Sequence, residues 1–251
     1  MDDINDNKPA FVSPNYIYVM EDEPFGYPVI TITAIDQDLG SNGRVKYRIE
    51  QGGSGDSFGK FSLQADTGLL MLQGALDYET TPKYVLNISA TDEGSPPLSS
   101  YQLLTIFLVD VNDNAPEFQP SLFFGNVSEN EPMGTTVMKI SASDQDSGTN
   151  GALIYSIPRG KVMSMFAINE SSGVIYTNST LDRETKDQYQ LTVYATDKAF
   201  PFRVGTCSVI ITVLDKNDHG PVFNPSRLNL TVFEEQGPFV FHTLTDRKSV
   251  V

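Results

Sequence analysis

Short runs of alternating apolar and polar residues recur along the whole chain. In one such run, Tyr84, Leu86, Ile88 and Ala90 fall on one face and Asn87 falls on the other. A period of two residues is typical of a β-strand that buries one face. Clusters of Gly, Pro, Asn and Asp separate the runs, and no stretch keeps a helical period over a useful length. The pattern therefore predicts an all-β fold.

The chain repeats itself after roughly a hundred residues, which divides it into similar units. The segment EDEP from Glu21 matches ENEP from Glu129, and the segment DQD from Asp36 matches DQD from Asp144. Each unit contains about seven strand-like runs. The sequence therefore predicts two similar β-domains in tandem.

A third element marks the boundaries between the units, because it occurs three times. It reads DINDNKPAF from Asp3, DVNDNAPEF from Asp110 and DKNDHGPVF from Asp215. The Pro in each copy stops regular strand pairing, and the Phe after it re-enters an apolar core. We therefore assign a linker from a preceding repeat to residues 1–7, complete repeats to 8–114 and 115–219, and the truncated start of a third repeat to 220–251.

The chain is strongly acidic, with a formal net charge of −15. Because it has no basic surface to meet phosphate groups, nucleic-acid binding is excluded as a function. Acidity of this kind often serves only solubility, and the alternative is that the acids bind cations. The recurring acids lie where strands end and where units meet, which favours the second interpretation.

Clustered Asp, Glu and Asn side chains offer the six to eight oxygen ligands that calcium takes. Two His and one Cys are too few for a closed zinc site. The DQD segments resemble the start of an EF-hand loop, but Tyr47 and Tyr155 stand at the twelfth position, where a bidentate Glu is required. The sequence therefore predicts Ca²⁺ bound between units by ligands distant in sequence.

Several features indicate an extracellular segment of a membrane-anchored protein. Cys207 stands alone, so no intrachain disulfide can form and a buried, inert thiol is expected. The N-terminus has neither the basic start nor the apolar stretch of a secretion signal, and the apolar run 103–109 is too short to cross a bilayer. We therefore expect the membrane anchor to lie outside this chain. Sequons predict glycosylation at Asn87, Asn126, Asn169, Asn178 and Asn229.

The ordered set of motifs EDEP or ENEP, DxDxGxNG, LDxE, ATD and DxNDNxPxF occurs twice over nearly the whole chain. This set resembles the extracellular repeats of the cadherin superfamily, closest in style to protocadherins or Fat/Dachsous-type cadherins. The resemblance implies a seven-stranded Greek-key sandwich for each repeat, with immunoglobulin-like topology, in a linear rod. It also implies three calcium ions between successive repeats.

The resemblance implies a complete ligand set at the joint around residues 110–114 and partial sets at the two ends. At the complete joint the implied ligands are Glu21, Asp77, Glu79, Asp110, Val111, Asn112, Asp113, Asn114, Asp144, Asp146, Asn150 and Asp197, with Val111, Asn114 and Asn150 acting through backbone carbonyls. The upstream joint would use Asp3, Asn5, Asp6, Asn7, Asp36, Asp38, Asn42 and Asp92. The downstream joint would use Glu129, Asp182, Glu184, Asp215, Asn217 and Asp218, where His219 replaces the usual Asn.

The function implied by the resemblance is calcium-dependent cell-cell adhesion, homophilic or heterophilic, with other cadherin ectodomains as partners at the plasma membrane. The alternative is a structural spacer with no adhesive interface of its own, because strand-swapping adhesion in classical cadherins needs a Trp that this chain lacks. Paired carboxylates such as Asp77 and Glu79 could in principle serve an enzyme as acid and base. Catalytic sites do not recur at every domain boundary, so we expect no enzymatic activity.

Overall fold

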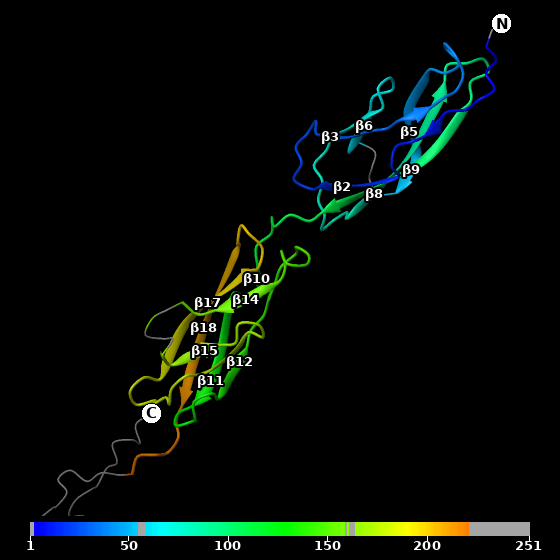
Figure 1. The fold of residues 1–251 in the computed structure, drawn as a ribbon. Coiled ribbons are helices and arrows are strands. Elements are labelled where there is room, and N and C mark those ends of the chain that lie inside the picture. Colours follow the sequence, from blue (N-terminus) through cyan, green and yellow to red (C-terminus); the bar gives the residue numbers. More distant parts are fainter. Residues whose placement is uncertain (1–2, 55–58, 159, 161–163, 221–251) are drawn as a thin grey trace, which may run out of the picture.

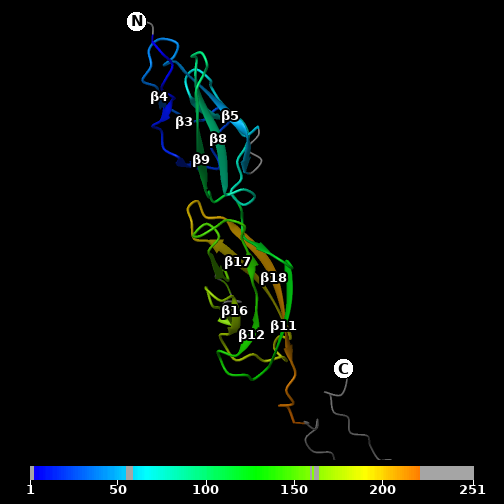
Figure 2. The ribbon, with the colours of Figure 1, turned by 90° about the vertical axis from the view of Figure 1, so that its right-hand side faces the viewer.

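The computed structural model describes residues 3–220, except 55–58, 159 and 161–163. Figures 1 and 2 show two elongated bodies, each made of strands, arranged end to end. We refer to the strands between residues 10 and 109 as the first module and to those between 117 and 214 as the second module. No α-helix occurs in the described residues, so the predicted all-β fold is confirmed.

The two modules contain equivalent strands in the same order. The first has β1 (Ala10–Phe11), β2 (Tyr16–Met20), β3 (Pro28–Thr31), β4 (Ala34–Ile35), β5 (Val45–Ser54), β6 (Phe61–Leu63), β7 (Leu69–Leu72), β8 (Lys83–Asp92) and β9 (Ser99–Val109). The second has β10 (Glu117–Phe118), β11 (Leu122–Ser128), β12 (Thr136–Lys139), β13 (Ala142–Ser143), β14 (Leu153–Ser156), β15 (Phe166–Ile168), β16 (Val174–Thr177), β17 (Gln188–Asp197) and β18 (Val204–Leu214).

Each module is a sandwich of a four-stranded and a three-stranded sheet. The order is β2-β9-β8-β5 against β3-β7-β6 in the first module, and β11-β18-β17-β14 against β12-β16-β15 in the second. The first two strands of each sandwich are divided into two pieces, β1 with β2 and β3 with β4 in the first module, and β10 with β11 and β12 with β13 in the second. One piece of each forms a short separate pair, β1–β4 or β10–β13. Counting each split strand once gives the expected seven strands and the Greek-key arrangement.

The predicted strand faces pack the two cores. Tyr84, Leu86, Ile88 and Ala90 are buried on β8, and they alternate with half-exposed Asn87. Two separate clusters of buried side chains result, one in each module. Each sandwich therefore buries its own apolar core.

Cys207 lies on the inner face of β18 and is buried. Burial raises the pKa of its thiol to about 11. The thiol is therefore protonated at neutral pH and is unsuited to nucleophilic or metal chemistry.

Candidate metal centre

The acids of the central joint lie at the ends of strands, where the two modules meet. In the first module Glu21 follows β2, and Asp77 and Glu79 lie between β7 and β8. Asp110 follows β9 in the linker, and Asp146 follows β13 of the second module. In a β-sandwich the loops that join the strands cluster at its two ends, which places residues distant in sequence side by side.

Two groups of carboxylates form at this joint and share one member. One oxygen from each of Glu21, Asp77 and Glu79 lies within 4.8 Å of the others, and the same holds for Glu79, Asp113 and Asp146. The second group draws on the first module, the linker and the second module. Beside them lies a cavity of about 180 Å³ lined by Asp77, Glu79, Thr80, Asp113, Asn114 and Gln145.

Glu21 fixes the start of the linker to the first module. Its side chain is 5% exposed, and its Oε1 accepts a hydrogen bond of 2.8 Å from the backbone N–H of Val111. Its Oε2 accepts a hydrogen bond from the N–H of Tyr78. A carboxylate that receives two backbone donors is held in one orientation.

The linker is also fixed to the second module, through Asp110 at its start and Asn114 at its end. Asp110 Oδ2 accepts hydrogen bonds from Asn150 Nδ2 at 3.0 Å and from the N–H of Ser147 at 2.9 Å. Asp146 accepts the backbone N–H of Asn114 at 3.2 Å as well as its side-chain amide. The loop that carries Asp146 is tight, since a Cβ at Gly151 would lie 2.1 Å from the carbonyl oxygen of Asp146. This close approach explains the second Gly of the DxDxGxNG motif, which is Gly151 here.

Five buried oxygens at this joint have no hydrogen-bond partner within the described residues. They are Glu79 Oε1, Asp110 Oδ1, Asn112 Oδ1, Asp144 Oδ2 and Asp197 Oδ1. Buried polar atoms are normally paired, and an unpaired one calls for a ligand such as an ion or water. All five belong to side chains that the sequence assigned as calcium ligands. The donors are carboxylate and amide oxygens, so the residues fit a hard divalent cation.

The carboxylates of this joint are crowded together in a partly desolvated place. Desolvation raises the pKa of Glu79 to about 7, and the neighbouring carboxylates Asp110, Glu21 and Asp113 contribute. Desolvation, followed by the charge of Asp146, raises the pKa of Asp113. Desolvation also raises the pKa of Asp144. A cation at this place would favour the charged form of these carboxylates, because it offsets both their desolvation and the smaller repulsion between them.

The upstream end contains the residues that correspond to the linker and the second-module side of the central joint. Asn7 donates its backbone N–H to Asp38 at 3.0 Å, as Asn114 does to Asp146. Asn42 Nδ2 lies 3.2 Å from Asp3 Oδ2, as Asn150 does from Asp110. Buried oxygens without a hydrogen-bond partner recur there on Asn5 and Asp36. No group of three close carboxylates was found at this end of the described chain. Asp6 and Asp92 complete the predicted upstream residues, and Asn5 Nδ2 donates to Asp92 Oδ1 at 3.1 Å.

The downstream end contains the residues that correspond to the first-module side of the central joint. Glu129 is fully buried and accepts the N–H groups of Arg183 and Lys216, each at 2.8 Å, which lower its pKa. Glu129, Asp182 and Glu184 bring three carboxylate oxygens within 4.8 Å of one another. Glu184 and Asp218 bring one carboxylate oxygen each within the same distance of a ring nitrogen of His219. Asp215 forms an ion pair of 3.3 Å with Arg183 Nε, and Asn217 is exposed. The predicted truncated repeat lies almost wholly outside the described residues.

Arg203 is a residue of the central joint that sequence reasoning missed. Its Nε donates a hydrogen bond of 2.7 Å to the backbone carbonyl of Asn112. Desolvation and Asp146 raise the pKa of Asp113, and the positive charge of Arg203 offsets part of that rise. Leu98 is the corresponding residue of the first module. The carbonyls of Leu98 and Arg203 accept the backbone N–H of Asp92 and of Asp197, and their own N–H groups donate to the side-chain carboxylates of the same two residues. Aligning the two repeats at this loop would have shown the unmatched positive charge.

Replacing Arg203 by Gln is expected to raise the calcium affinity of the joint about two- to threefold, because a fixed positive charge beside the acidic groups is removed. Calorimetric titration with calcium measures the change. Arg48→Gln is a matched control, since Arg48 is exposed on β5 and lines none of the acidic groups. A lower affinity in the Arg203→Gln protein would mean that positioning of the linker outweighs the charge.

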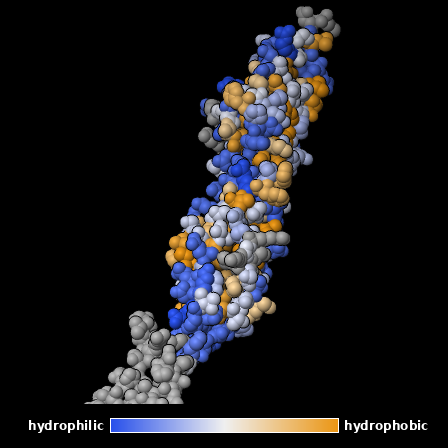
Figure 3. Space-filling model, turned by 90° about the vertical axis from the view of Figure 1, so that its left-hand side faces the viewer, coloured by the Kyte–Doolittle hydropathy of each residue, from blue (hydrophilic) through white to orange (hydrophobic). Residues whose placement is uncertain are grey.

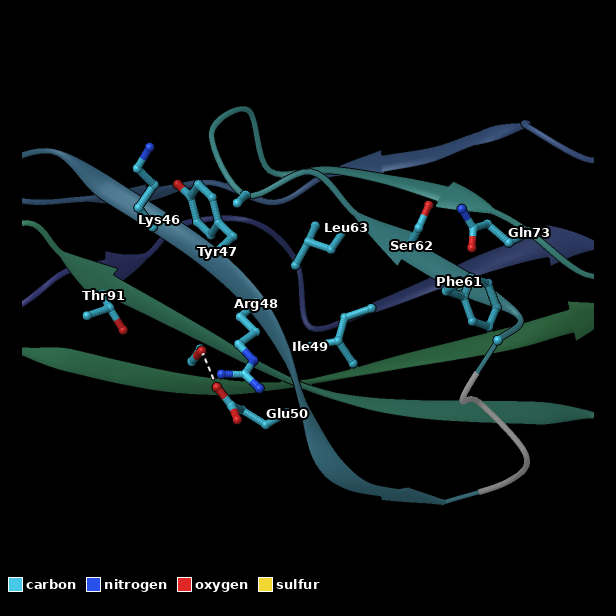
Figure 4. Close-up of a pocket in the computed structure, with 13 residues that line it drawn as sticks. Lys46, Tyr47, Arg48, Ile49, Glu50, Phe61, Ser62, Leu63, Gln73 and Thr91 are labelled. Atoms are coloured by element: carbon cyan, nitrogen blue, oxygen red, sulfur yellow. Dashed lines mark hydrogen bonds between the residues drawn. The ribbon is translucent and has the colours of Figure 1, made fainter.

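A larger cavity of about 700 Å³ lies away from these acids, in the first module between β5 and β6. Figure 4 shows Tyr47, Ile49, Glu50, Phe61 and Leu63 among its lining residues. Glu50 accepts a hydrogen bond of 2.7 Å from the hydroxyl of Ser89. The cavity shares no residue with the carboxylate groups.

The described sequons lie on strands or at their ends. Asn87 lies on β8 and Asn126 on β11, while Asn169 lies between β15 and β16 and Asn178 directly follows β16. Asn126, Asn169 and Asn178 are exposed. Asn229 lies outside the described residues. No helix in the described part of the chain is long and apolar enough to span a membrane.

Comparison with known families and proteins supports the resemblance seen in the sequence. The family model described as "Cadherin domain" matches residues 15–109 and 123–214. Protocadherin-16 of Rattus norvegicus is 42% identical over 242 residues, which cover 96% of this chain and 7% of that protein. Protocadherin Fat 4 of Mus musculus is 39% identical over 235 residues, which cover 94% of this chain and 5% of that protein.

Solved structures with the same architecture include repeats EC22-24 of mouse Cadherin-23. That structure has a TM-score of 0.75 and 34% identity, and the match covers 85% of this chain and 67% of that chain. The protocadherin gammaB7 EC3-6 cis-dimer structure has a TM-score of 0.76 and 35% identity, covering 87% and 54%. The similarity therefore extends across both modules.

Proposed function

This chain belongs to the cadherin family, and on that premise we propose that it forms a segment of a cell-adhesion ectodomain whose modules are held in a fixed orientation by calcium. Cadherins are adhesion proteins rather than enzymes, so the acidic groups are not catalytic. We place this segment outside the cell, on a protein anchored in the plasma membrane by parts beyond this chain. Other cadherin ectodomains are the proposed partners.

The buried oxygens without hydrogen-bond partners are the observation that carries this proposal. They occur on predicted ligands at the central joint and again on Asn5 and Asp36 at the upstream joint. Calcium at the central joint would be held by the residues assigned to it from the sequence. When bound, the ions supply positive charge to side-chain oxygens that come from both modules and the linker.

The charge balance explains why calcium would fix the joint. Three divalent ions would reduce the formal charge of its carboxylates from −8 to −2, which removes most of the repulsion between them. Without calcium, this repulsion favours opening of the joint. The eight carboxylates are Glu21, Asp77, Glu79, Asp110, Asp113, Asp144, Asp146 and Asp197.

The main effect of calcium is rigidity rather than folding. Extracellular calcium modules bind at about 10⁻⁴ to 10⁻³ M, so each occupied site contributes only about 0.5 to 1.5 kcal/mol at millimolar calcium. Each module has its own buried core, which does not depend on the joint. We propose 8–114 and 115–219 as the two repeats that this joint connects.

A structural spacer is the second candidate, and the absence of Trp from the sequence favours it. Strand-swapping adhesion needs a Trp, so this segment would have to adhere through another surface or not at all. Sedimentation velocity with calcium and with a chelator separates the candidates, together with aggregation of beads coated with the chain. An adhesive segment forms calcium-dependent oligomers and aggregates beads. A spacer stays monomeric in both conditions.

A further inference from the structure

The outward face of the four-stranded sheet in the first module carries exposed apolar side chains around a sequon. Asn87 on β8 pairs with Leu103 on β9, and Ser89 pairs with Tyr101. Leu103 is 61% exposed and Tyr101 is 65% exposed. Directly opposite residues in an antiparallel pair have Cβ atoms about 5 Å apart, and diagonal neighbours lie about 7–8 Å apart. Asn87 therefore stands beside both apolar side chains.

The apolar surface continues from β9 to the edge strand β2. Tyr18 pairs with Phe107, and their rings stack with centroids 5.4 Å apart. Tyr18 is 67% exposed, and the ring of Tyr16 meets it edge-on at 6.2 Å. Large side chains of this kind are seldom left bare as one contiguous surface. We call Tyr16, Tyr18, Tyr101, Leu103 and Phe107 the aromatic face of the first module.

The second module has a sequon beside exposed apolar side chains on its corresponding sheet. Phe124 is 70% exposed on β11, and Asn126 follows it two residues later on the same face. Phe124 pairs with Ile210 of β18. Figure 3 shows hydrophobic patches among hydrophilic side chains along the surface of both modules.

The two sequons do not occupy corresponding positions. Counting back from Glu129 and from Glu21, Asn126 corresponds to Tyr18. Counting back from Asp197 and from Asp92, Thr192 on β17 corresponds to Asn87. One sequon is on the central strand β8 and the other on the edge strand β11. Each module therefore has a sequon beside apolar side chains, at a different position of its four-stranded sheet.

We propose that N-linked oligosaccharides on Asn87 and Asn126 lie across the outward faces of β2-β9-β8-β5 and β11-β18-β17-β14 and cover their apolar side chains. An N-linked glycan is bulky and solubilising, and the flat C–H face of its first N-acetylglucosamine packs on aromatic rings. The proposal rests on the extracellular location given above. According to this proposal, the chain's own sugar covers the aromatic face, and no protein partner binds there.

The remaining described sequons place glycans near a further sheet. Asn169 directly follows β15 and Asn178 directly follows β16, so glycans there would also lie beside the three-stranded sheet of the second module. No described sequon lies on β3, β7 or β6 of the first module. If this segment adheres, the β3-β7-β6 sheet is therefore the sheet open to a protein partner.

The test uses the chain secreted from mammalian cells behind an added secretion signal. Glycopeptide mass spectrometry measures occupancy at each sequon, and hydroxyl-radical footprinting measures the labelling of Tyr101 and Phe124. We expect both sequons to be occupied. Labelling of Tyr101 in Asn87→Gln and of Phe124 in Asn126→Gln should rise about threefold, because the covering sugar is lost. Phe25, which is 78% exposed between β2 and β3, is the internal reference.

Asn169→Gln is the matched control and should leave the labelling of Tyr101 unchanged. Enzymatic removal of the sugars from the folded wild-type protein gives the same comparison without a Gln substitution. An unoccupied Asn87 or Asn126, or equal labelling with and without sugar, overturns the proposal. Those results would leave calcium titration of the joint unaffected, so failure of this inference is distinguishable from failure of the calcium account.

Discussion

Replacing Asp146 by Ala is expected to lower the calcium affinity of the central joint about tenfold or more, because calcium affinity follows the number of charged ligands. Asp146 is buried and lies in one carboxylate group with Glu79 and Asp113. Loss of its charge removes the only carboxylate that the second module gives to this group. Calorimetric titration of the variant beside the parent chain measures the effect.

Two controls separate this effect from a general loss of charge. Glu170→Ala removes an exposed carboxylate that belongs to none of the close acidic groups, and it should leave the affinity unchanged. Asp38→Ala alters the corresponding residue of the upstream end and should spare the central joint. Circular dichroism without calcium should show the same β-structure in every variant. Equal affinity of the Asp146→Ala and parent proteins would remove Asp146 from the ligand set.

Replacing Phe166 by Ala is expected to unfold the second module selectively. Phe166 is fully buried and its ring meets that of Tyr189 edge-on at 5.2 Å. Truncation of such a side chain costs about 3–5 kcal/mol, which is a large part of the stability of one domain. The first module has a separate core, so its thermal transition should stay in place. Differential scanning calorimetry in chelator measures both transitions.

The matched experiment is Phe61→Ala in the first module. Phe61 is buried against Tyr84 at 5.4 Å in the same edge-on geometry, and it lies at the start of β6 as Phe166 lies at the start of β15. Its replacement should lower the transition of the first module and spare that of the second. If either substitution lowered both transitions equally, the modules would share one folding unit and the proposed boundary near 114 would be wrong.

Much of the fold follows from the sequence because its pattern is local and repeated. The alternation in residues 84–90 predicts a strand with one buried face, and the structure buries that face. The splitting of the first strand into β1 and β2 was not predicted. It depends on pairing of Ala10 with Ile35 and of Tyr16 with Thr105, and such long-range pairings leave no local pattern.

The candidate metal centre could be assigned by motif but not by geometry. The motifs give the acids, and the structure shows which of them come within reach of one another, such as Glu79, Asp113 and Asp146. The unpaired oxygen of Asn112 depends on burial in the folded joint, which a sequence does not show. Arg203 was missed because a search for acidic ligands does not consider a basic side chain.

Small-angle X-ray scattering of the chain, with millimolar calcium and again with excess chelator, tests the central claim most directly. With calcium, we predict the scattering of a rod in which the two modules keep one orientation. With chelator, repulsion among the carboxylates of the 110–114 joint should free the modules to take many orientations, while circular dichroism shows that both sandwiches remain folded. Scattering that keeps the same rod dimensions after chelation would contradict the account.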